Sequence, residues 1–220
     1  MNPDPRLTSD RLENTIVLAS ASPRRSQLLA SAGIAFTVVG SDAPETIQPG
    51  ESPQQHVRRL SLLKAREVAH RSHITGRWFI GSDTVVVRDA AILGKPADAG
   101  EAAAMLGSLS GRSHNVITGF AIIDRIGRTE TVETVSTRVW FRELTDLEIQ
   151  GYIATGEPFG KAGAYAIQGI GACMIPAIEG SYTNVVGLPL CEVVATLEKL
   201  GAIRLFASGA PRSDHLDPPS

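Results

Sequence analysis

Apolar and polar positions follow two different periods along this chain, which together predict strands interleaved with helices. Short apolar runs bounded by turn residues predict buried strands at 15–19, 36–39, 78–87 and near 173–178. Two serine–proline pairs, Ser22-Pro23 and Ser52-Pro53, are typical of helix starts, because serine caps the first turn and proline fits the first helical position. The first of these helices is expected to stop at Gly33, and the second to run past Val68.

The second half of the chain continues this alternation. Helices are predicted over the alanine-rich stretch 99–109, after the capping box that begins at Thr145, and over 189–200. Two long alternating stretches, 114–124 and 129–141, flank a turn and predict an antiparallel hairpin. Mixed connections between the elements, together with a long hairpin, indicate an α/β protein with a mixed, twisted sheet and flanking helices. We expect one domain over 14–206, with unstructured segments at 1–13 and 207–220.

Composition narrows the possible functions. The formal net charge is −2, so no overall positive field favours binding to a nucleic acid duplex. The two cysteines, Cys173 and Cys191, have no CxxC spacing, which disfavours a disulfide scaffold or structural zinc and favours a reducing cytoplasm. No apolar run approaches the roughly 20 residues that span a bilayer, so no membrane partner is expected.

Several catalytic and nucleotide-binding motifs are missing from the sequence. It contains no GxxxxGK[ST], HExxH or GxSxG, and Gly169-Ile170-Gly171 lacks the third glycine of a dinucleotide-binding turn. The five histidines are scattered, and His114, at the start of a predicted strand, is interpreted as structural.

The segment from Ser20 to Arg25 places two serines and two arginines where a strand turns into a helix. Free backbone N–H groups and the helix dipole suit phosphate oxygens at such a point, and a guanidinium can hold phosphate in a bidentate manner. Ser20, Ser22, Arg24 and Arg25 are therefore candidate phosphate-binding residues. Taken alone, the segment favours the simpler interpretation of a capped helix with solvated arginines.

Asp83 lies in an otherwise apolar predicted strand, next to Thr84. A carboxylate there costs several kcal/mol unless it is paired, hydrogen-bonded or metal-bound, so a functional role is favoured. It could bind Mg²⁺ or accept a proton from an attacking water. Lys95 follows in a proline-stiffened turn, where an exposed lysine and a functional one are equally good interpretations.

A second candidate loop covers residues 160–169 and is rich in glycine and alanine. Such a backbone can approach a ligand closely. Lys161 supplies charge to this loop, and Gln168 an amide that can read a base edge. Two further residues, Lys64 on a long predicted helix and Glu45 in a polar stretch, indicate nothing by themselves.

Taken together, these segments resemble the Maf family of nucleoside triphosphate pyrophosphatases, also called septum-formation proteins. The resemblance covers about residues 15–200 and is carried, in order, by LASASPRR (18–25), RLSLLKA (59–65), GSDTVV (81–86), GKPADAGEAAAML (94–106), KAGAYAIQG (161–169) and GSYTNVVGLPL (180–190). It implies an elongated, two-lobed fold like that of inosine-triphosphate pyrophosphatases, with a central cleft. It also implies hydrolysis of a nucleoside triphosphate to monophosphate and pyrophosphate with Mg²⁺ or Mn²⁺, and a homodimer.

The resemblance also implies roles for single residues. Asp83 is expected to accept the proton and, with Glu45, to hold the metal. The phosphates are expected to contact four cationic side chains, those of Arg25, Lys64, Lys95 and Lys161. Of these, Lys64 and Lys95 are counted among the catalytic residues. These roles agree with the positive charge that a leaving pyrophosphate requires.

The base is expected to be a pyrimidine. Arg24, Thr84 and Gln168 match the family branch that acts on dTTP and UTP, whereas the 7-methyl-GTP branch usually has Trp at the position of Arg24. Three alternatives stay open: 7-methyl-GTP, a broader set of triphosphates, and a nucleotide-binding regulator of cell division that turns over nothing.

One departure from the family pattern precedes Lys161. The family usually has Asp there, but this chain has Gly160, so Asp98 is considered as a substitute carboxylate. Ala166, where glycine is common, is a milder change.

Overall fold

The computed structural model describes residues 15–89 and 91–206, so the expectations for 1–13 and 207–220 lie outside the described residues. In that part, seven strands form one mixed sheet in the order β2-β1-β3-β5-β6-β7, with β4 paired to β3. The strands are β1 Ile16–Leu18, β2 Phe36–Val38, β3 Trp78–Arg88, β4 Ala91–Leu93, β5 Ser113–Asp124, β6 Thr129–Trp140 and β7 Ala177–Glu179. The mixed α/β sheet predicted from the sequence is confirmed.

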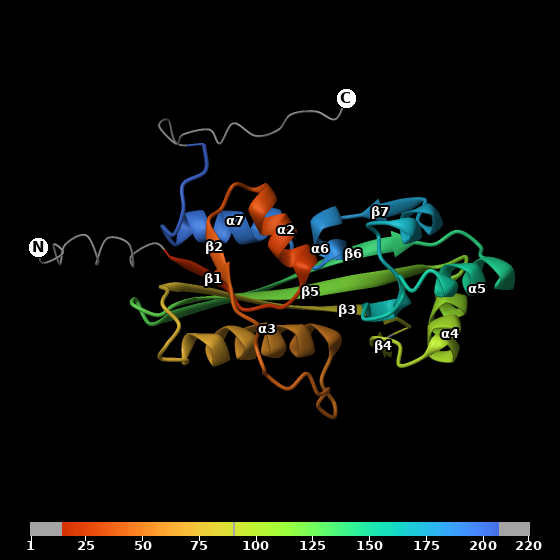
Figure 1. Cartoon of the computed structure of the whole chain (residues 1–220), viewed down its shortest axis with the longest axis horizontal. Coiled ribbons are helices and arrows are strands. Elements are labelled where there is room, and N and C mark those ends of the chain that lie inside the picture. The colour runs from red at the N-terminus through yellow and green to blue at the C-terminus, as the bar shows by residue number, and fades with distance from the viewer. Residues whose placement is uncertain (1–14, 90, 207–220) are drawn as a thin grey trace, which may run out of the picture.

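The helices cover both faces of the sheet and one of its ends. They are α2 Pro23–Ser31, α3 Pro53–Ala69, α4 Ala99–Leu109, α5 Asp146–Ala154, α6 Tyr182–Val186 and α7 Leu190–Lys199, with 3-10 turns η1 Ala162–Ala164 and η2 Ile170–Met174. Figure 1 shows an elongated molecule in which α3 lies on one face, α2 and α7 lie on the other, and α4 and α5 gather at the far end. None of the described helices is long and apolar enough to cross a membrane.

Buried apolar residues divide into clusters that follow this arrangement. One large cluster joins β1, β3 and β5 to α2 and α7, and includes Leu29, Trp78 and Leu197. A second joins α4 and α5 to the far ends of β5 and β6, and includes Leu106, Val116 and Tyr152. Each end of the long hairpin is therefore packed by its own set of helices, which produces two lobes.

Two glycines bring α3 unusually close to the sheet. A Cβ on Gly81 in β3 would lie 2.1 Å from the main-chain oxygen of Ser61, and one on Gly119 in β5 would lie 2.3 Å from that of Val57. Real Cβ atoms do not approach so closely, so both positions require glycine for this packing. The close approach places the side chains of α3 directly over β3.

The expectation for residues 173–178 was wrong in its first half. Ile170–Met174 form the 3-10 turn η2, and the strand β7 begins only at Ala177. The N–H groups of Ile170 and Gly171 donate to the Glu157 carboxylate, which holds this segment in a turn. The short elements β4 and α6 were not predicted, because three to five residues carry little periodicity.

Candidate active site in the cleft between the lobes

The cleft opens where β3 has a free edge. Leu18, the last residue of β1, pairs with Ile80, and β4 pairs with β3 only from Val86 onward. Between these points, residues 81–85 have no strand partner on this edge among the described strands. A cavity of about 790 Å³ lies here. Because the edge is open, neighbours on opposite faces of the strand, Asp83 and Thr84, both line the cavity.

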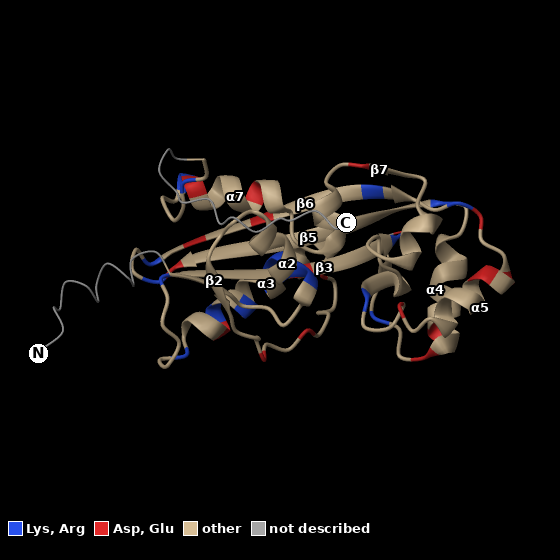
Figure 2. Cartoon of the chain, turned by 45° about the horizontal axis from the view of Figure 1, so that its top comes forward, with Lys and Arg blue, Asp and Glu red and all other residues tan. Residues whose placement is uncertain are grey.

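All eleven residues singled out from the sequence line this one cavity: Ser20, Ser22, Arg24, Arg25, Glu45, Lys64, Asp83, Thr84, Lys95, Lys161 and Gln168. They come from segments that lie far apart in the sequence. Figure 2 shows basic and acidic residues interspersed along the molecule, with basic residues of α2 beside the middle of the sheet.

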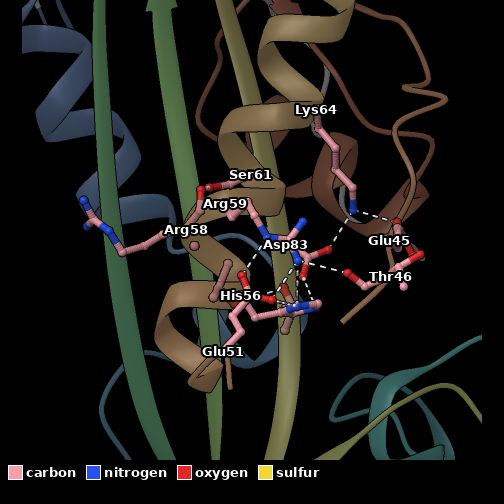
Figure 3. Close-up of polar contacts among 12 residues, drawn as sticks. Glu45, Thr46, Glu51, His56, Arg58, Arg59, Ser61, Lys64 and Asp83 are labelled. Carbon is pink, nitrogen blue, oxygen red and sulfur yellow. Dashed lines mark hydrogen bonds and ion pairs between the residues drawn. The ribbon is translucent and has the colours of Figure 1, made fainter. Parts of the chain in front are cut away.

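Four of these residues form the charged cluster: Glu45, Lys64, Asp83 and Lys95. The buried Lys64 on α3 donates from Nζ to Oδ1 of Asp83 at 2.7 Å and lies 2.6 Å from Oε1 of Glu45. Lys95 donates to the other oxygen of Glu45 at 3.1 Å. Figure 3 shows the Lys64 side chain reaching from the helix to both carboxylates. Lys64 therefore joins α3, β3 and the irregular segment that carries Glu45.

The ion pairs change the acidity of Glu45. Burial raises the pKa of this carboxyl, but the hydrogen bond and charge of Lys64, followed by those of Lys95, outweigh burial and lower the pKa to about 2. Glu45 therefore stays ionised at neutral pH, and 48% of its side chain is exposed to solvent. The segment that carries it is consequently tied to both lysines.

Sequence reasoning missed His56, which lines the same cavity from the first turn of α3. Its Nε2 lies 4.0 Å from Oδ2 of Asp83, and its Nδ1 lies 3.0 Å from Oε2 of Glu51. Glu51 also accepts from Nε of Arg59 at 2.6 Å. Figure 3 shows this chain of polar side chains from Glu51 to Asp83. Its only sequence signal is the Ser52 capping box, which places residues 51 and 56 at a helix start.

Arg25 uses most of its donors on the protein itself. Its Nε donates to the Gly187 oxygen at 2.8 Å, and its Nη1 donates to the Ser82 oxygen at 2.8 Å and to Ser20 Oγ at 3.1 Å. Nη2 donates to Thr84 Oγ1 at 3.2 Å. Burial lowers the pKa of the Arg25 guanidinium, and the Asp83 charge raises it. Arg25 thus connects α2, β3 and the turn before α7, with few donors left for a phosphate.

The serines at the start of α2 behave differently from each other. Ser20 is buried and bonded to Arg25, whereas Ser22 occupies the N-cap position with no capping bond from its side chain within the described residues. The expected serine cap is therefore present in position only, and Ser22 lines the cavity.

Three other residues form the loop cluster: Arg24, Lys161 and Gln168. Burial lowers the pKa of Arg24, and the nearby Glu157 carboxylate raises it. Burial lowers the pKa of Lys161 as well, Arg24 lowers it further, and Glu157 raises it. Lys161 Nζ donates to the main-chain oxygen of Glu157. Two cations thus lie close together in the cleft beside one anion, which favours a phosphate ligand.

Gly160, where the family usually has Asp, lies in a main-chain conformation that suits glycine. Gly160 lines the cavity with φ of 73°, a conformation that favours glycine. Asp98 caps α4 by accepting from the N–H of Glu101 at 2.8 Å, which gives its carboxylate a structural task. Among the described residues no group of three or more His, Cys, Asp or Glu side chains is arranged to hold a metal ion.

Comparison with known proteins identifies the family to which this chain is similar. A family model described as "Maf-like protein" matches residues 15–200. A protein of Syntrophotalea carbinolica named "dTTP/UTP pyrophosphatase" is 73% identical over 220 residues, which are 100% of both chains. A protein of the same name from Citrifermentans bemidjiense is 58% identical over 190 residues, 86% of this chain and 97% of its own. One from Myxococcus xanthus is 51% identical over 189 residues, 86% and 94% of the two chains.

Proposed function

This chain belongs to the Maf family, and from that premise we propose that its cleft hydrolyses dTTP and UTP to the nucleoside monophosphate and pyrophosphate. The observation that carries the proposal is the charged cluster, in which a buried aspartate and a lysine meet at the floor of a cationic cavity. The names of the similar proteins support the substrates. Removal of surplus or modified pyrimidine triphosphates is the corresponding cellular role.

The proposed reaction is attack of water on the α-phosphorus. The bond from that phosphorus to the bridging oxygen breaks, and pyrophosphate leaves. Asp83 accepts the proton of the water, since it is buried beside the cavity and Lys64 donates to its Oδ1 rather than to its Oδ2. Lys64 and Lys95 stabilise the charge that develops on the phosphate oxygens, and Lys161 binds the phosphates of the substrate. Arg25 contributes mainly by holding Ser20 and Thr84 in place.

A divalent metal ion fits the donors that are present. The carboxylates of Glu45 and Asp83 both reach one point, where Lys64 Nζ lies within 2.7 Å of each. Mg²⁺ in enzymes typically takes one or two carboxylates and completes its shell with waters and substrate phosphates. We propose Mg²⁺ or Mn²⁺ held by Glu45 and Asp83 together with the triphosphate. Such an ion would supply further positive charge for the leaving pyrophosphate.

Recognition of the base is assigned to Arg24, Thr84 and Gln168. Gln168 presents both a donor and an acceptor, as the Watson–Crick edge of uracil or thymine requires. The Thr84 hydroxyl lies 3.0 Å from that of Thr118 and accepts from Arg25, so its position is set from within the protein. We further propose a cytoplasmic homodimer whose single domain spans residues 14–206, which the family resemblance supports and light scattering after size exclusion tests.

The test is pyrophosphate release from dTTP, UTP, CTP and 7-methyl-GTP with Mg²⁺ or Mn²⁺, for wild type and Asp83→Asn. We expect dTTP and UTP to be preferred, and the variant to lose at least about 10²-fold in kcat. Release from 7-methyl-GTP alone would overturn the pyrimidine assignment. Nucleotide binding without pyrophosphate release by wild type would instead support a regulator that does no chemistry.

A further inference from the structure

Glu157 lies at the turn after α5, behind the loop that carries Lys161 and Gln168, and none of the proposed steps uses it. Its carboxylate accepts three hydrogen bonds. Tyr152 Oη and the Gly171 N–H each donate to Oε1 at 2.8 Å, and the Ile170 N–H donates to Oε2 at 3.0 Å. Such a carboxylate is fixed in place by several donors at once.

The main chain is anchored both before and after Gln168. On the near side, the Ala166 N–H donates to Tyr152 Oη at 3.2 Å. On the far side, Gly169 adopts φ of 96°, and a Cβ there would lie 2.4 Å from Glu157 Oε2. The main chain on each side of Gln168 therefore rests on the Tyr152–Glu157 pair. Figure 1 shows this segment returning from α5 toward the middle of the sheet.

The same residue also contacts the phosphate-binding half of the loop. The main-chain oxygen of Glu157 accepts from Lys161 Nζ, and the Glu157 charge acts on both Lys161 and Arg24. Glu157 is thus connected to Lys161 through its main chain and to Arg24 through its charge. Its connection to Gln168 is indirect, because its carboxylate holds the main chain that follows this residue.

We propose that Glu157 is the positioning residue that makes the loop cluster selective, by fixing the main chain that carries Gln168 relative to Lys161 and Arg24. This inference rests on the proposed function. A glutamine amide that turns freely can serve uracil, with its N3–H donor and O4 acceptor, or cytosine, with the opposite pattern. Discrimination between them therefore depends on how closely the main chain of the loop restricts the place and the orientations open to this amide.

The decisive variant is Glu157→Gln, which keeps the size of the side chain. One of the two carboxylate oxygens becomes an NH₂ group, so in either orientation an amino group faces an N–H or O–H donor of the loop. We expect the KM for dTTP to rise about tenfold while kcat changes less than threefold. The ratio of kcat/KM for dTTP to that for CTP should fall at least fivefold.

Glu148→Gln is the matched control. Glu148 belongs to the same helix, α5, and accepts from Thr145 at its N-terminus and from Arg142, so this variant also loses one charge and part of a hydrogen-bond network. It should leave KM and the dTTP/CTP ratio unchanged. Tyr152→Phe, which removes one donor to Glu157 and the acceptor of Ala166, should shift the ratio in the same direction by a smaller factor.

Each outcome decides the matter. The inference is overturned if Glu157→Gln lowers kcat equally for every nucleotide with KM and the ratio unchanged, or changes nothing. If that variant does not fold, judged by its melting curve, Tyr152→Phe decides by the same ratio. A wild-type protein that releases no pyrophosphate refutes the proposed function itself, whereas an active wild type with an unchanged ratio in both variants refutes only the role of Glu157.

Discussion

The charged cluster and the loop cluster line one cavity but are built in different ways. In the charged cluster, Lys64 and Asp83 project from a long helix and a central strand, and ion pairs between side chains hold them. In the loop cluster, an irregular segment is held mainly by hydrogen bonds from its main chain to Glu157. Regular elements thus carry Lys64 and Asp83, whereas an irregular segment carries Lys161 and Gln168.

The two clusters also differ in net charge. Two lysines and two carboxylates make the charged cluster formally neutral, whereas Arg24 and Lys161 give the loop cluster two positive charges before Glu157 is counted. A triphosphate entering the cavity is therefore attracted first by the loop cluster. In the charged cluster, Lys64 lies between its two carboxylates. A substrate phosphate must therefore compete with these carboxylates for Lys64, and a metal ion must compete with Lys64 for the carboxylates.

The largest expected effect separates these two contributions. Lys64→Met leaves Glu45 and Asp83 without their shared partner and should lower kcat by about 10²- to 10³-fold. Lys161→Met should mainly raise the KM for dTTP, by about tenfold, because Lys161 attracts the phosphates before reaction. Steady-state pyrophosphate release measures both, and Lys199→Met, an exposed lysine on α7, is the control. Equal effects on kcat from both lysines would erase the distinction between the clusters.

The second prediction concerns the close packing that places Lys64 over Asp83. Gly81→Ala puts a methyl group against the Ser61 and Ala65 backbone, so α3 must shift. We expect a loss of about 2–3 kcal/mol in the free energy of unfolding, together with reduced kcat. Gly107→Ala in α4, where nothing lies within 4 Å, should stabilise by about 0.5–1 kcal/mol. Urea unfolding measures both, and an unaltered stability for Gly81→Ala would show that α3 can move away without loss.

In the charged cluster, the sequence pointed to one residue, Asp83, for a physical reason. Asp83 stood out because a carboxylate in an apolar strand needs a partner, and Lys64 is indeed that partner. The long elements were predicted because 3.6- and 2-residue periods persist over them, as in α3 and the β5–β6 hairpin. Lys64 alone gave no signal, because its role depends on the close packing of α3 on Gly81 and Gly119, which exists only in the folded protein.

The loop cluster could be predicted only as a set of residue types. Lys161 and Gln168 were recognised, but Glu157 and Tyr152 were not, since their importance comes from main-chain N–H groups that have no side-chain identity. The dependence on main-chain contacts also explains why the strand predicted near 173–178 was wrong in its first half. A carboxylate fourteen residues away in sequence decides that Gly171 lies in a turn, and no local pattern contains this information.

The smallest expected effect tests what lies beneath the loop cluster. Tyr165, within that loop, is hydrogen-bonded through its Oη to Nε2 of His114 at 2.7 Å, and His114 Nδ1 has no hydrogen-bond partner among the described residues. Burial lowers the pKa of His114 from 6.5 to about 4. The folded state therefore keeps this histidine neutral between pH 6.5 and 4, whereas the unfolded chain takes up a proton. Stability from this site is complete above pH 6.5 and declines as the pH falls.

Between pH 7 and pH 5, His114 should thus reduce the free energy of unfolding by about 2 kcal/mol. His114→Gln retains a partner for Tyr165 and does not titrate. The free energy of unfolding of this variant should therefore fall less than that of wild type between the two pH values, by the amount assigned to His114. His73→Gln, at an exposed histidine, should follow wild type. Urea unfolding at the two pH values measures the difference. Parallel losses in wild type and His114→Gln would mean that the acid sensitivity arises elsewhere, and the ion pairs of the charged cluster would then be the next place to look.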